Sequence, residues 1–148
     1  MAKGDKLYNK ALKEANKHTK ASNKKALLLL EKAAKVKNKN ALYALATWYL
    51  FGKVVDLNFP KAVELLEESA SQFHPCALFD LAICYEKGEG VEKNESYAFS
   101  FYLKSALLGD KQAVYEIGRM FYYGIGVSEN RILAQDCLDV ADYLKVKS

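Results

Sequence analysis

Apolar residues recur at helical spacing along most of the chain, and glycines interrupt the pattern at regular distances. Near the middle, Ala77, Leu81 and Tyr85 follow one another at i, i+4 and i+8, which is the spacing of one face of an α-helix. Gly88 comes next, where a helix commonly ends in a residue with positive φ. Asn94 then suits the N-cap of a second apolar helical run. The pattern predicts a helix, a glycine turn and a second helix.

This pattern repeats with a period of 36 residues. The positions that agree in kind are Ala41, Ala77 and Ala113; Leu45, Leu81 and Ile117; Tyr49, Tyr85 and Phe121; Gly52, Gly88 and Gly124; Val55, Val91 and Val127; Asn58, Asn94 and Asn130. A second series of small residues is Ala26, Ala62, Ala98 and Ala134. A fixed period of about 20–50 residues is typical of repeat proteins, in which each copy buries its apolar face against the next. The expected fold is all-α, an alpha-alpha superhelix (solenoid) of about four helix-turn-helix repeats with eight helices.

The repeats extend over the whole chain, which we expect to be a single repeat domain of residues 1–148. Its expected parts are a degenerate N-terminal capping repeat at 5–40 and regular repeats at 41–76, 77–112 and 113–148. Helices are expected at 5–17 and 23–36, with a polar connector at 18–22, and the last helix at about 130–145. Asp142 lies where earlier copies carry alanine, and a carboxylate there suits the end of a repeat array.

The repeated pattern resembles the Sel-1-like repeat, a relative of the tetratricopeptide repeat. The second copy carries the resemblance at Ala77, Leu81, Tyr85, Gly88, Gly90, Val91, Tyr102, Lys104 and Ala106. The other copies carry it at Ala41, Leu45, Tyr49, Gly52, Val55, Lys61, Ala62, Ala113, Ile117, Gly118, Phe121, Gly124, Gly126 and Val127. The chain departs from the pattern at Ala46 and Ala82, where the family has a glycine inside the first helix, and at Val54, where it has the second turn glycine. The resemblance covers about residues 23–142 and implies that the first helix of each repeat lines a concave surface.

Side chains on that concave face do not repeat in kind, unlike the structural positions. Helical spacing from position 44 selects Ala44, Thr47, Trp48 and Phe51, then Asp80, Ile83, Cys84 and Lys87, then Glu116, Arg119, Met120 and Tyr123. Exposed apolar patches mark partner sites, and Trp, Tyr and Arg are common interface anchors. The candidate partner-binding residues are therefore Thr47, Trp48, Phe51, Asp80, Ile83, Lys87, Glu116, Arg119, Met120 and Tyr123. The alternatives are that these side chains are buried within a tight superhelix or form a homodimer contact.

Charge is distributed unevenly along the chain. The net charge is +4, but residues 1–40 contain 12 lysines and three acidic residues, whereas residues 41–148 are mildly acidic. A lysine-rich end can bind nucleic acid or an anionic surface. This end contains no arginine and only Tyr8 as an aromatic residue, so it has few side chains that could stack on bases. We therefore expect nucleic acid to be a less suitable partner than a protein, and a charged face that keeps the chain soluble is the simpler interpretation.

The cysteines and the lack of a long apolar segment indicate the cellular compartment in which we expect the protein. The longest aliphatic run, residues 26–30, is too short to span a bilayer, and the first ten residues contain no secretory h-region. Three cysteines, Cys76, Cys84 and Cys137, form an odd set without regular spacing. Some secreted members of the Sel-1-like family carry a disulfide pair in every repeat, and this chain does not. We expect a reducing cytoplasm.

No pattern in the chain predicts catalysis. His74 and Cys76 have suitable spacing for two metal ligands, but nothing nearby supplies a third and a fourth. The glycines at 88 and 90 follow a helix and lack the lysine of a phosphate-binding loop, so they are interpreted as a helix stop. We expect no enzymatic activity, no cofactor and no metal site.

The function that these observations favour is a non-enzymatic adaptor or scaffold that binds a protein or peptide in the concave groove. One alternative is an immunity or inhibitor protein that neutralises a toxin. Another is attachment of the lysine-rich N-terminal end to nucleic acid or to an anionic surface. Composition and spacing do not separate these, because each would use the same helical repeat.

Overall fold

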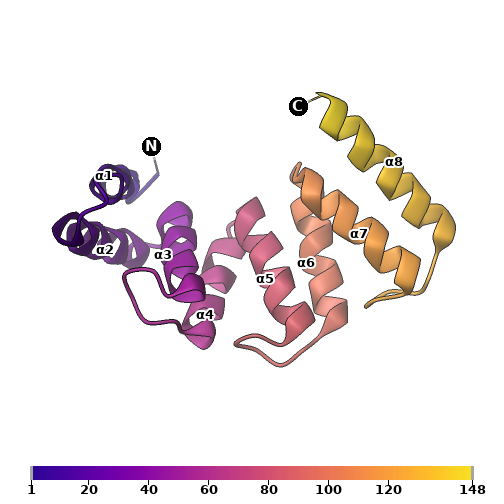
Figure 1. The fold of residues 1–148 in the computed structure, drawn as a ribbon, viewed down its shortest axis with the longest axis horizontal. Coiled ribbons are helices and arrows are strands. Elements are labelled where there is room, and N and C mark those ends of the chain that lie inside the picture. Colours follow the sequence, from indigo (N-terminus) through magenta and orange to yellow (C-terminus); the bar gives the residue numbers. More distant parts are fainter. Residues whose placement is uncertain (1, 148) are drawn as a thin grey trace. The chain divides into compact units, whose positions relative to one another are not determined.

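The computed structural model describes residues 2–147, with the side chains of residues 146 and 147 outside the description. Within these residues the chain forms eight helices and no strand (Figure 1). The helices are α1 (Asp5–Ala15), α2 (Lys20–Lys35), α3 (Lys39–Phe51), α4 (Phe59–Ala70), α5 (Pro75–Lys87), α6 (Glu95–Leu107), α7 (Lys111–Tyr123) and α8 (Arg131–Lys147). The all-α prediction and the number of helices are confirmed.

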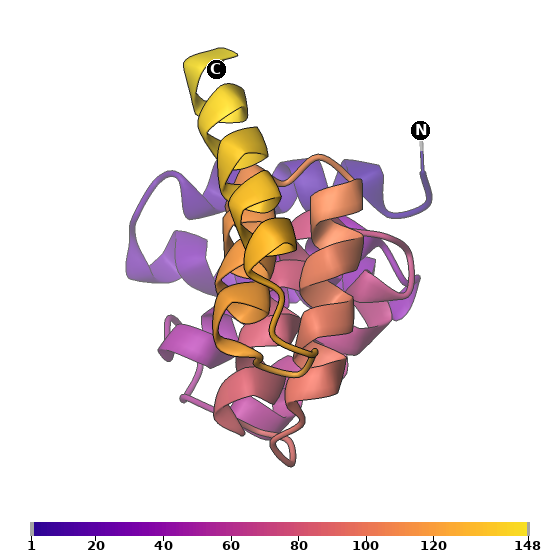
Figure 2. The same cartoon turned by 90° about the vertical axis from the view of Figure 1, so that its right-hand side faces the viewer.

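Consecutive helices pack as hairpins, α1 with α2, α3 with α4, α5 with α6 and α7 with α8. The chain divides into two compact units of two hairpins each, a first unit up to His74 and a second unit from Pro75. In the first unit α2 packs on α3, and in the second unit α6 packs on α7. Figure 2 shows α6, α7 and α8 of the second unit side by side.

Glycines end the first helix of each regular hairpin, and asparagines begin the second. Gly52, Gly88 and Gly124 have φ of 63°, 74° and 68°, a region that L side chains rarely adopt. The asparagine side chains at the N-caps accept hydrogen bonds of 3.0 Å from the backbone N–H groups of Lys61, Tyr97 and Leu133. Such a cap contributes about 1 kcal/mol to helix stability. The turn glycines and N-cap asparagines predicted from the repeat are therefore confirmed.

The boundary between the first two helices differs from the prediction. The connector expected at 18–22 is shorter, because α2 begins at Lys20. Thr19 and Ser22 form a reciprocal capping box: the Ser22 N–H donates to Thr19 Oγ1 at 3.1 Å, and the Thr19 N–H donates to Ser22 Oγ at 3.0 Å. Serine takes the place of the usual glutamate or glutamine in this motif, so the start of the helix was placed three residues too late.

Small residues allow close packing within each hairpin. The alanines at positions 26, 62 and 98 are 0% exposed and Ala134 is 1% exposed, as their periodic recurrence predicted. At Gly118, within α7, an added Cβ would lie 3.1 Å from the Cβ of Cys137 and 3.3 Å from the carbonyl oxygen of Ala134. The mid-helix glycine therefore permits α8 to approach α7, which explains a residue that costs about 1 kcal/mol in helix propensity relative to alanine.

Candidate binding groove on the second unit

A concavity of about 780 Å³ lies between α5, α6 and α7 of the second unit. Its apolar lining includes Phe79, Ile83 and Ile125, and its charged lining includes Glu86, Glu116 and Arg119. The two flanking helices, α5 and α7, are the first helices of their hairpins, and Tyr102 on α6 also lines the concavity. We call this concavity the groove.

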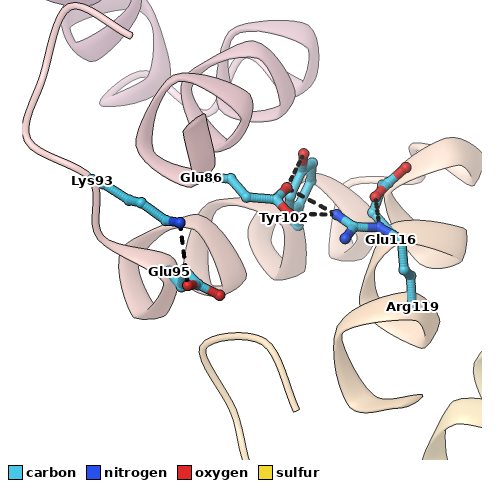
Figure 3. Close-up of polar contacts among 6 residues, drawn as sticks. All are labelled: Glu86, Lys93, Glu95, Tyr102, Glu116 and Arg119. Carbon is cyan, nitrogen blue, oxygen red and sulfur yellow. Dashed lines mark hydrogen bonds and ion pairs between the residues drawn. The ribbon is translucent and has the colours of Figure 1, made fainter. Parts of the chain in front are cut away.

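A network of hydrogen bonds connects the three helices inside the groove (Figure 3). Arg119 Nη2 donates to both carboxylate oxygens of Glu86 at 2.8 Å, and Arg119 Nε donates to Glu116 Oε2 at 2.7 Å. The hydroxyl group of Tyr102 donates to Glu86 Oε1 at 3.2 Å. The charged side chains are only 19–29% exposed, so their geometry is fixed better than that of surface ion pairs.

The protonation states of the network follow from burial and from the neighbouring charges. Burial, reinforced by the charges of Glu86 and Glu116, raises the pKa of Tyr102 above its usual value. The phenol therefore stays protonated and donates a hydrogen bond to Glu86. Burial opposes the charge of Arg119, but its hydrogen bonds to Glu116 and Glu86 outweigh this effect and raise the pKa of the guanidinium. Arg119 is therefore a cation and Tyr102 a neutral phenol around neutral pH.

One wall of the groove depends on a close backbone contact. A Cβ at Gly126, which has φ of 68°, would lie 2.1 Å from the carbonyl oxygen of Glu95 at the start of α6. Only glycine fits there. The contact fixes the turn that follows α7, and it thereby positions the adjacent Ile125 in the groove lining. On the same side, Lys93 Nζ lies 3.7 Å from Glu95 Oε1.

Comparison with known families and structures identifies the repeats. The Sel1 repeat profile matches residues 17–37, 39–72, 77–110 and 111–141. The chain belongs to the Sel1 repeat family. The resemblance inferred from the spacing of alanines, aromatics and glycines is thus confirmed.

Solved structures of Sel1 repeat proteins are similar to this chain. A Sel1 repeat protein from Oxalobacter formigenes is 32% identical with a TM-score of 0.78, over 82% of this chain and 35% of that protein. The protective antigen c5321 of uropathogenic Escherichia coli is 18% identical with a TM-score of 0.80, over 97% of this chain and 33% of that protein. Cysteine rich protein B of Helicobacter pylori is 24% identical with a TM-score of 0.65, over 85% and 90% of the two chains.

These likenesses support the solenoid class predicted from the sequence. The chain spans about a third of the length of the first two of these proteins. No match to a curated protein was found. Among the described residues, no helix combines the length and apolar character needed to cross a bilayer.

The structure brings four of the ten candidate residues of the Sel1 repeats into the groove: Ile83, Lys87, Glu116 and Arg119. Trp48 and Met120 are 7% and 0% exposed. They are therefore removed from the candidate contact residues, because a buried side chain cannot meet a partner. Met120 instead belongs to the core cluster that contains Ala82, Ala98, Tyr102 and Ile117.

The remaining candidates lie outside the groove lining. Phe51 and Tyr123 are 79% and 66% exposed, and each is the last residue of its helix. Thr47 and Asp80 are partly buried, and Thr47 Oγ1 donates to the carbonyl oxygen of Ala44 at 2.7 Å. None of these four residues lines the groove.

Sequence reasoning missed the residues that complete the groove, among them Phe79, Glu86 and Tyr102. The candidate residues were chosen at helical spacing from position 44 and from its equivalents in the other repeats. In the second repeat that spacing selects Lys87 and passes over the adjacent Glu86. The missed signal is a contrast between repeats: where Glu86 stands, the other two copies carry Leu50 and Tyr122. A carboxylate at an otherwise apolar repeat position requires a partner, and Arg119 supplies it.

The histidine and cysteine candidates have other surroundings. The His74 ring stacks on Tyr43 with 4.7 Å between ring centroids, and burial, together with the charge of Lys39, lowers its pKa. The three cysteines are free thiols, and Cys84 is 1% exposed. Burial, with the charges of Glu89 and Asp80, raises the pKa of Cys84 to about 11. In the described part of the chain, no three potential ligands of the His, Cys, Asp or Glu type gather as a metal site would require.

Proposed function

We propose that this Sel1 repeat chain is a non-enzymatic binding module and that its groove holds an extended segment of a protein partner. The observation that carries the proposal is the fixed network of Glu86, Arg119 and Glu116 inside a concavity with apolar walls. Concave sites with a few well-positioned polar groups among apolar side chains are typical of ligand recognition. The helices that flank the groove are those for which the family resemblance implies a concave face.

Two polar groups of the network have capacity for further hydrogen bonds. Among the described residues, neither Arg119 Nη1 nor Glu116 Oε1 has a hydrogen-bond partner. The first is a donor and the second is an acceptor. The main chain of an extended peptide offers the complementary pair, a carbonyl oxygen and an N–H group, in each residue. A polypeptide segment therefore fits the groove better than a ligand with one kind of polar group.

Apolar contact area is available beside these polar groups. Phe79, Ile83 and Ile125 pack against the core cluster of the second unit, but each remains partly exposed in the groove. Burial of apolar surface contributes about 25 cal/mol per Å², so side chains of a partner that cover these residues would contribute most of the affinity. The polar network would set the direction of the bound segment.

The same geometry favours binding over catalysis. A general acid or base needs a pKa near the working pH, whereas the shifts at Tyr102 and Arg119 move both groups away from neutrality. We propose that the module acts as an adaptor in a reducing cytoplasm, the compartment that suits its free thiols. An inhibitor that occludes another protein would use the same groove, and the partner's identity distinguishes the two roles.

Selection from a displayed library of random peptides tests the proposal. We expect the wild-type chain to select peptides that bind with a measurable Kd in calorimetry. Ile83→Asp places a charge on the apolar wall and should weaken binding by about tenfold or more, since it removes apolar contact and adds an unpaired carboxylate. Arg119→Ala should weaken binding to a similar extent by opening the network.

Arg131→Ala is the matched control. Arg131 also pairs with a glutamate, Glu129 at 3.0 Å, and stacks on Tyr122 at 3.8 Å, but it lies outside the groove lining. Its removal should leave peptide affinity unchanged. If the selected peptides bind Ile83→Asp as tightly as wild type while that variant keeps its helical circular dichroism, the groove is not the binding site.

A further inference from the structure

The turn between α3 and α4 of the first unit exposes three apolar side chains. Phe51 is 79% exposed, Leu57 is 57% exposed and Val54 is 39% exposed. They are spaced three residues apart around the turn that follows the Gly52 helix end. We call this segment, residues 51–57, the apolar turn. An exposed apolar patch of this kind marks an interaction surface in soluble proteins.

The repeat itself does not require apolar residues at these positions. The second copy carries Lys87, Gly90 and Lys93 there, and the third carries Tyr123, Gly126 and Glu129. All three turns connect the two helices of a hairpin and begin with a glycine at positive φ. Because glycine or charged residues take the places of Val54 and Leu57 in the other copies, folding does not explain these two apolar residues, whereas Phe51 has an aromatic counterpart in Tyr123.

Val54 adds a second, independent indication. Its φ is 68°, and the glycines at the equivalent positions 90 and 126 have φ of 75° and 68°. A β-branched residue in this region is an outlier, since its Cβ approaches the carbonyl oxygen too closely. Glycine or asparagine would relieve the strain, yet the chain retains valine at the exposed turn. A strained residue that folding does not need points to a use for its side chain.

The turn lies at the end of the first unit opposite to Lys3 and Lys37. Asn38 Nδ2 donates to the carbonyl oxygen of Lys3 at 3.1 Å, and Gln72 Nε2 donates to that of Lys37 at 2.8 Å. These bonds gather the start of α1, the α2–α3 junction and the end of α4 at one end of the unit. Because consecutive helices pack as hairpins, the turns α1–α2 and α3–α4 lie toward the other end.

Three exposed lysines lie on the segments at that end: Lys53 is within the turn, and Lys20 and Lys24 are in the first turns of α2. Asp56, also exposed, lies within the turn and offsets one of them. Two other acidic residues of these segments are paired, Glu14 with Lys17 at 3.0 Å and Glu64 with Lys61 at 3.7 Å. The three lysines and Asp56 leave a positive net charge at the end of the unit that carries the protruding apolar side chains.

We propose that the apolar turn is a membrane-surface contact that inserts into the headgroup region of an anionic bilayer, with the exposed lysines at that end of the unit on the lipid phosphates. An anionic bilayer is complementary to both features, because it offers an apolar phase below a negative surface. Nucleic acid would neutralise the lysines but offers no apolar phase for Val54 and Leu57. Each lysine near the surface adds a modest attraction that salt screens.

Co-sedimentation of the full chain with vesicles tests this proposal. The chain should bind vesicles of phosphatidylcholine with phosphatidylserine, bind those of phosphatidylcholine alone much more weakly, and lose affinity as salt is raised. The double variant Phe51→Ser with Leu57→Ser should lower the partition coefficient about tenfold or more. The matched control is Phe73→Ser, since Phe73 is 64% exposed but follows α4 at the other end of the unit; it should bind like wild type.

Insertion itself is tested by placing a fluorophore in the turn. Phe51→Trp should shift its emission to the blue with anionic vesicles and be quenched by brominated lipids, whereas Phe73→Trp should show neither effect. Equal vesicle binding by the double variant, or unchanged emission of Phe51→Trp in bound protein, would overturn the proposal. A wild-type chain that does not bind vesicles would also overturn it. The same holds if the chain binds duplex DNA instead of vesicles and the double variant binds that DNA equally well. Peptide affinity of the groove is measured separately, so its failure and this one are distinguishable.

Discussion

The two units use the same helical hairpin for different surface chemistry. The first unit contains 14 lysines and seven acidic residues, and the second contains eight basic and 11 acidic residues. In the first unit the distinctive feature is an exposed apolar turn, whereas in the second it is a charged network held between helices. The comparison shows which residues the repeat needs. Alanine, glycine and asparagine recur because packing, turns and caps require them, and the residues that differ between copies determine what each unit can bind.

Each unit also carries its own spectroscopic or chemical probe, so the unfolding of the two units can be measured separately. The only tryptophan, Trp48, lies in the first unit, and all three cysteines lie in the second. Tryptophan emission therefore reports unfolding of the first unit, and labelling of the buried thiol of Cys84 reports unfolding of the second. Stability in a repeat protein is approximately a sum of contributions from copies and their interfaces, so a local substitution should affect the nearer probe first.

The largest effect is expected at the turn glycine of the second unit. Gly126→Ala would place a Cβ 2.1 Å from a backbone oxygen that cannot move without displacing the start of α6. We expect a loss of about 4 kcal/mol or more in the free energy of unfolding, measured by urea denaturation. Thiol labelling should become faster at lower urea than the change in Trp48 emission.

Gly109→Ala provides the control for backbone strain alone. Gly109 has φ of 99°, but an added Cβ would meet nothing within 4 Å. Its substitution should cost only about 1–2 kcal/mol. Equal losses for the two variants would show that positive φ, and not the close approach to α6, determines the need for glycine at position 126.

The next effect separates two aromatic residues one helical turn apart in α3. Trp48 is 7% exposed and Phe51 is 79% exposed. Trp48→Ala should lower the free energy of unfolding by about 3–5 kcal/mol, because it removes a large buried side chain. Phe51→Ala should change it by about 0.5 kcal/mol or less. Thermal unfolding followed by circular dichroism measures both, and similar losses would contradict the burial assigned to Trp48.

Trp48 also shows how far the sequence predicts this fold. The period, the turn glycines and the N-cap asparagines are local features, and each requires a particular backbone conformation or hydrogen bond. They located the three hairpins that follow the first one. Whether an individual side chain on the concave face is buried depends on how closely neighbouring helices approach. The spacing of residues along one helix gives no information about that distance.

The groove was predictable only in part for a related reason. Arg119 and Glu116 are three residues apart on one helix, so helical spacing brings them together. Glu86 and Tyr102 reach the same network from two other helices, and that convergence requires the packing of α5, α6 and α7. Comparing repeat positions for a misplaced charge identifies Glu86 but not the residue with which it pairs.

A smaller effect concerns the buried thiol of the second unit. The pKa of Cys84 in the folded chain is about 11, above the ordinary value of 9.0, because burial disfavours the thiolate. The folded state therefore holds its proton more tightly than the unfolded state. Its contribution to stability is full below pH 9 and is lost as the pH rises to 11, by roughly 2 kcal/mol in total.

Urea denaturation at a series of pH values measures this loss, and Cys84→Ala isolates it from the titration of tyrosines and lysines. The difference between wild type and Cys84→Ala should narrow between pH 9 and 11. Iodoacetamide at pH 8 should modify the exposed Cys76 well before Cys84. Rapid modification of Cys84 in the folded protein would contradict the burial on which the pKa shift depends.

The smallest effect is expected at Val54, where the first unit departs from the turn glycine of the other copies. Asparagine tolerates positive φ better than any β-branched residue, so Val54→Asn should raise the free energy of unfolding by about 0.5–1 kcal/mol. Val54→Thr keeps the branched Cβ and should give no gain. Because the site is in the first unit, the shift in urea midpoint should appear in Trp48 emission. A stabilised Val54→Asn that also binds anionic vesicles less well would show that this turn sacrifices stability for an exposed apolar side chain, whereas the groove of the second unit is built on a turn where glycine cannot be replaced.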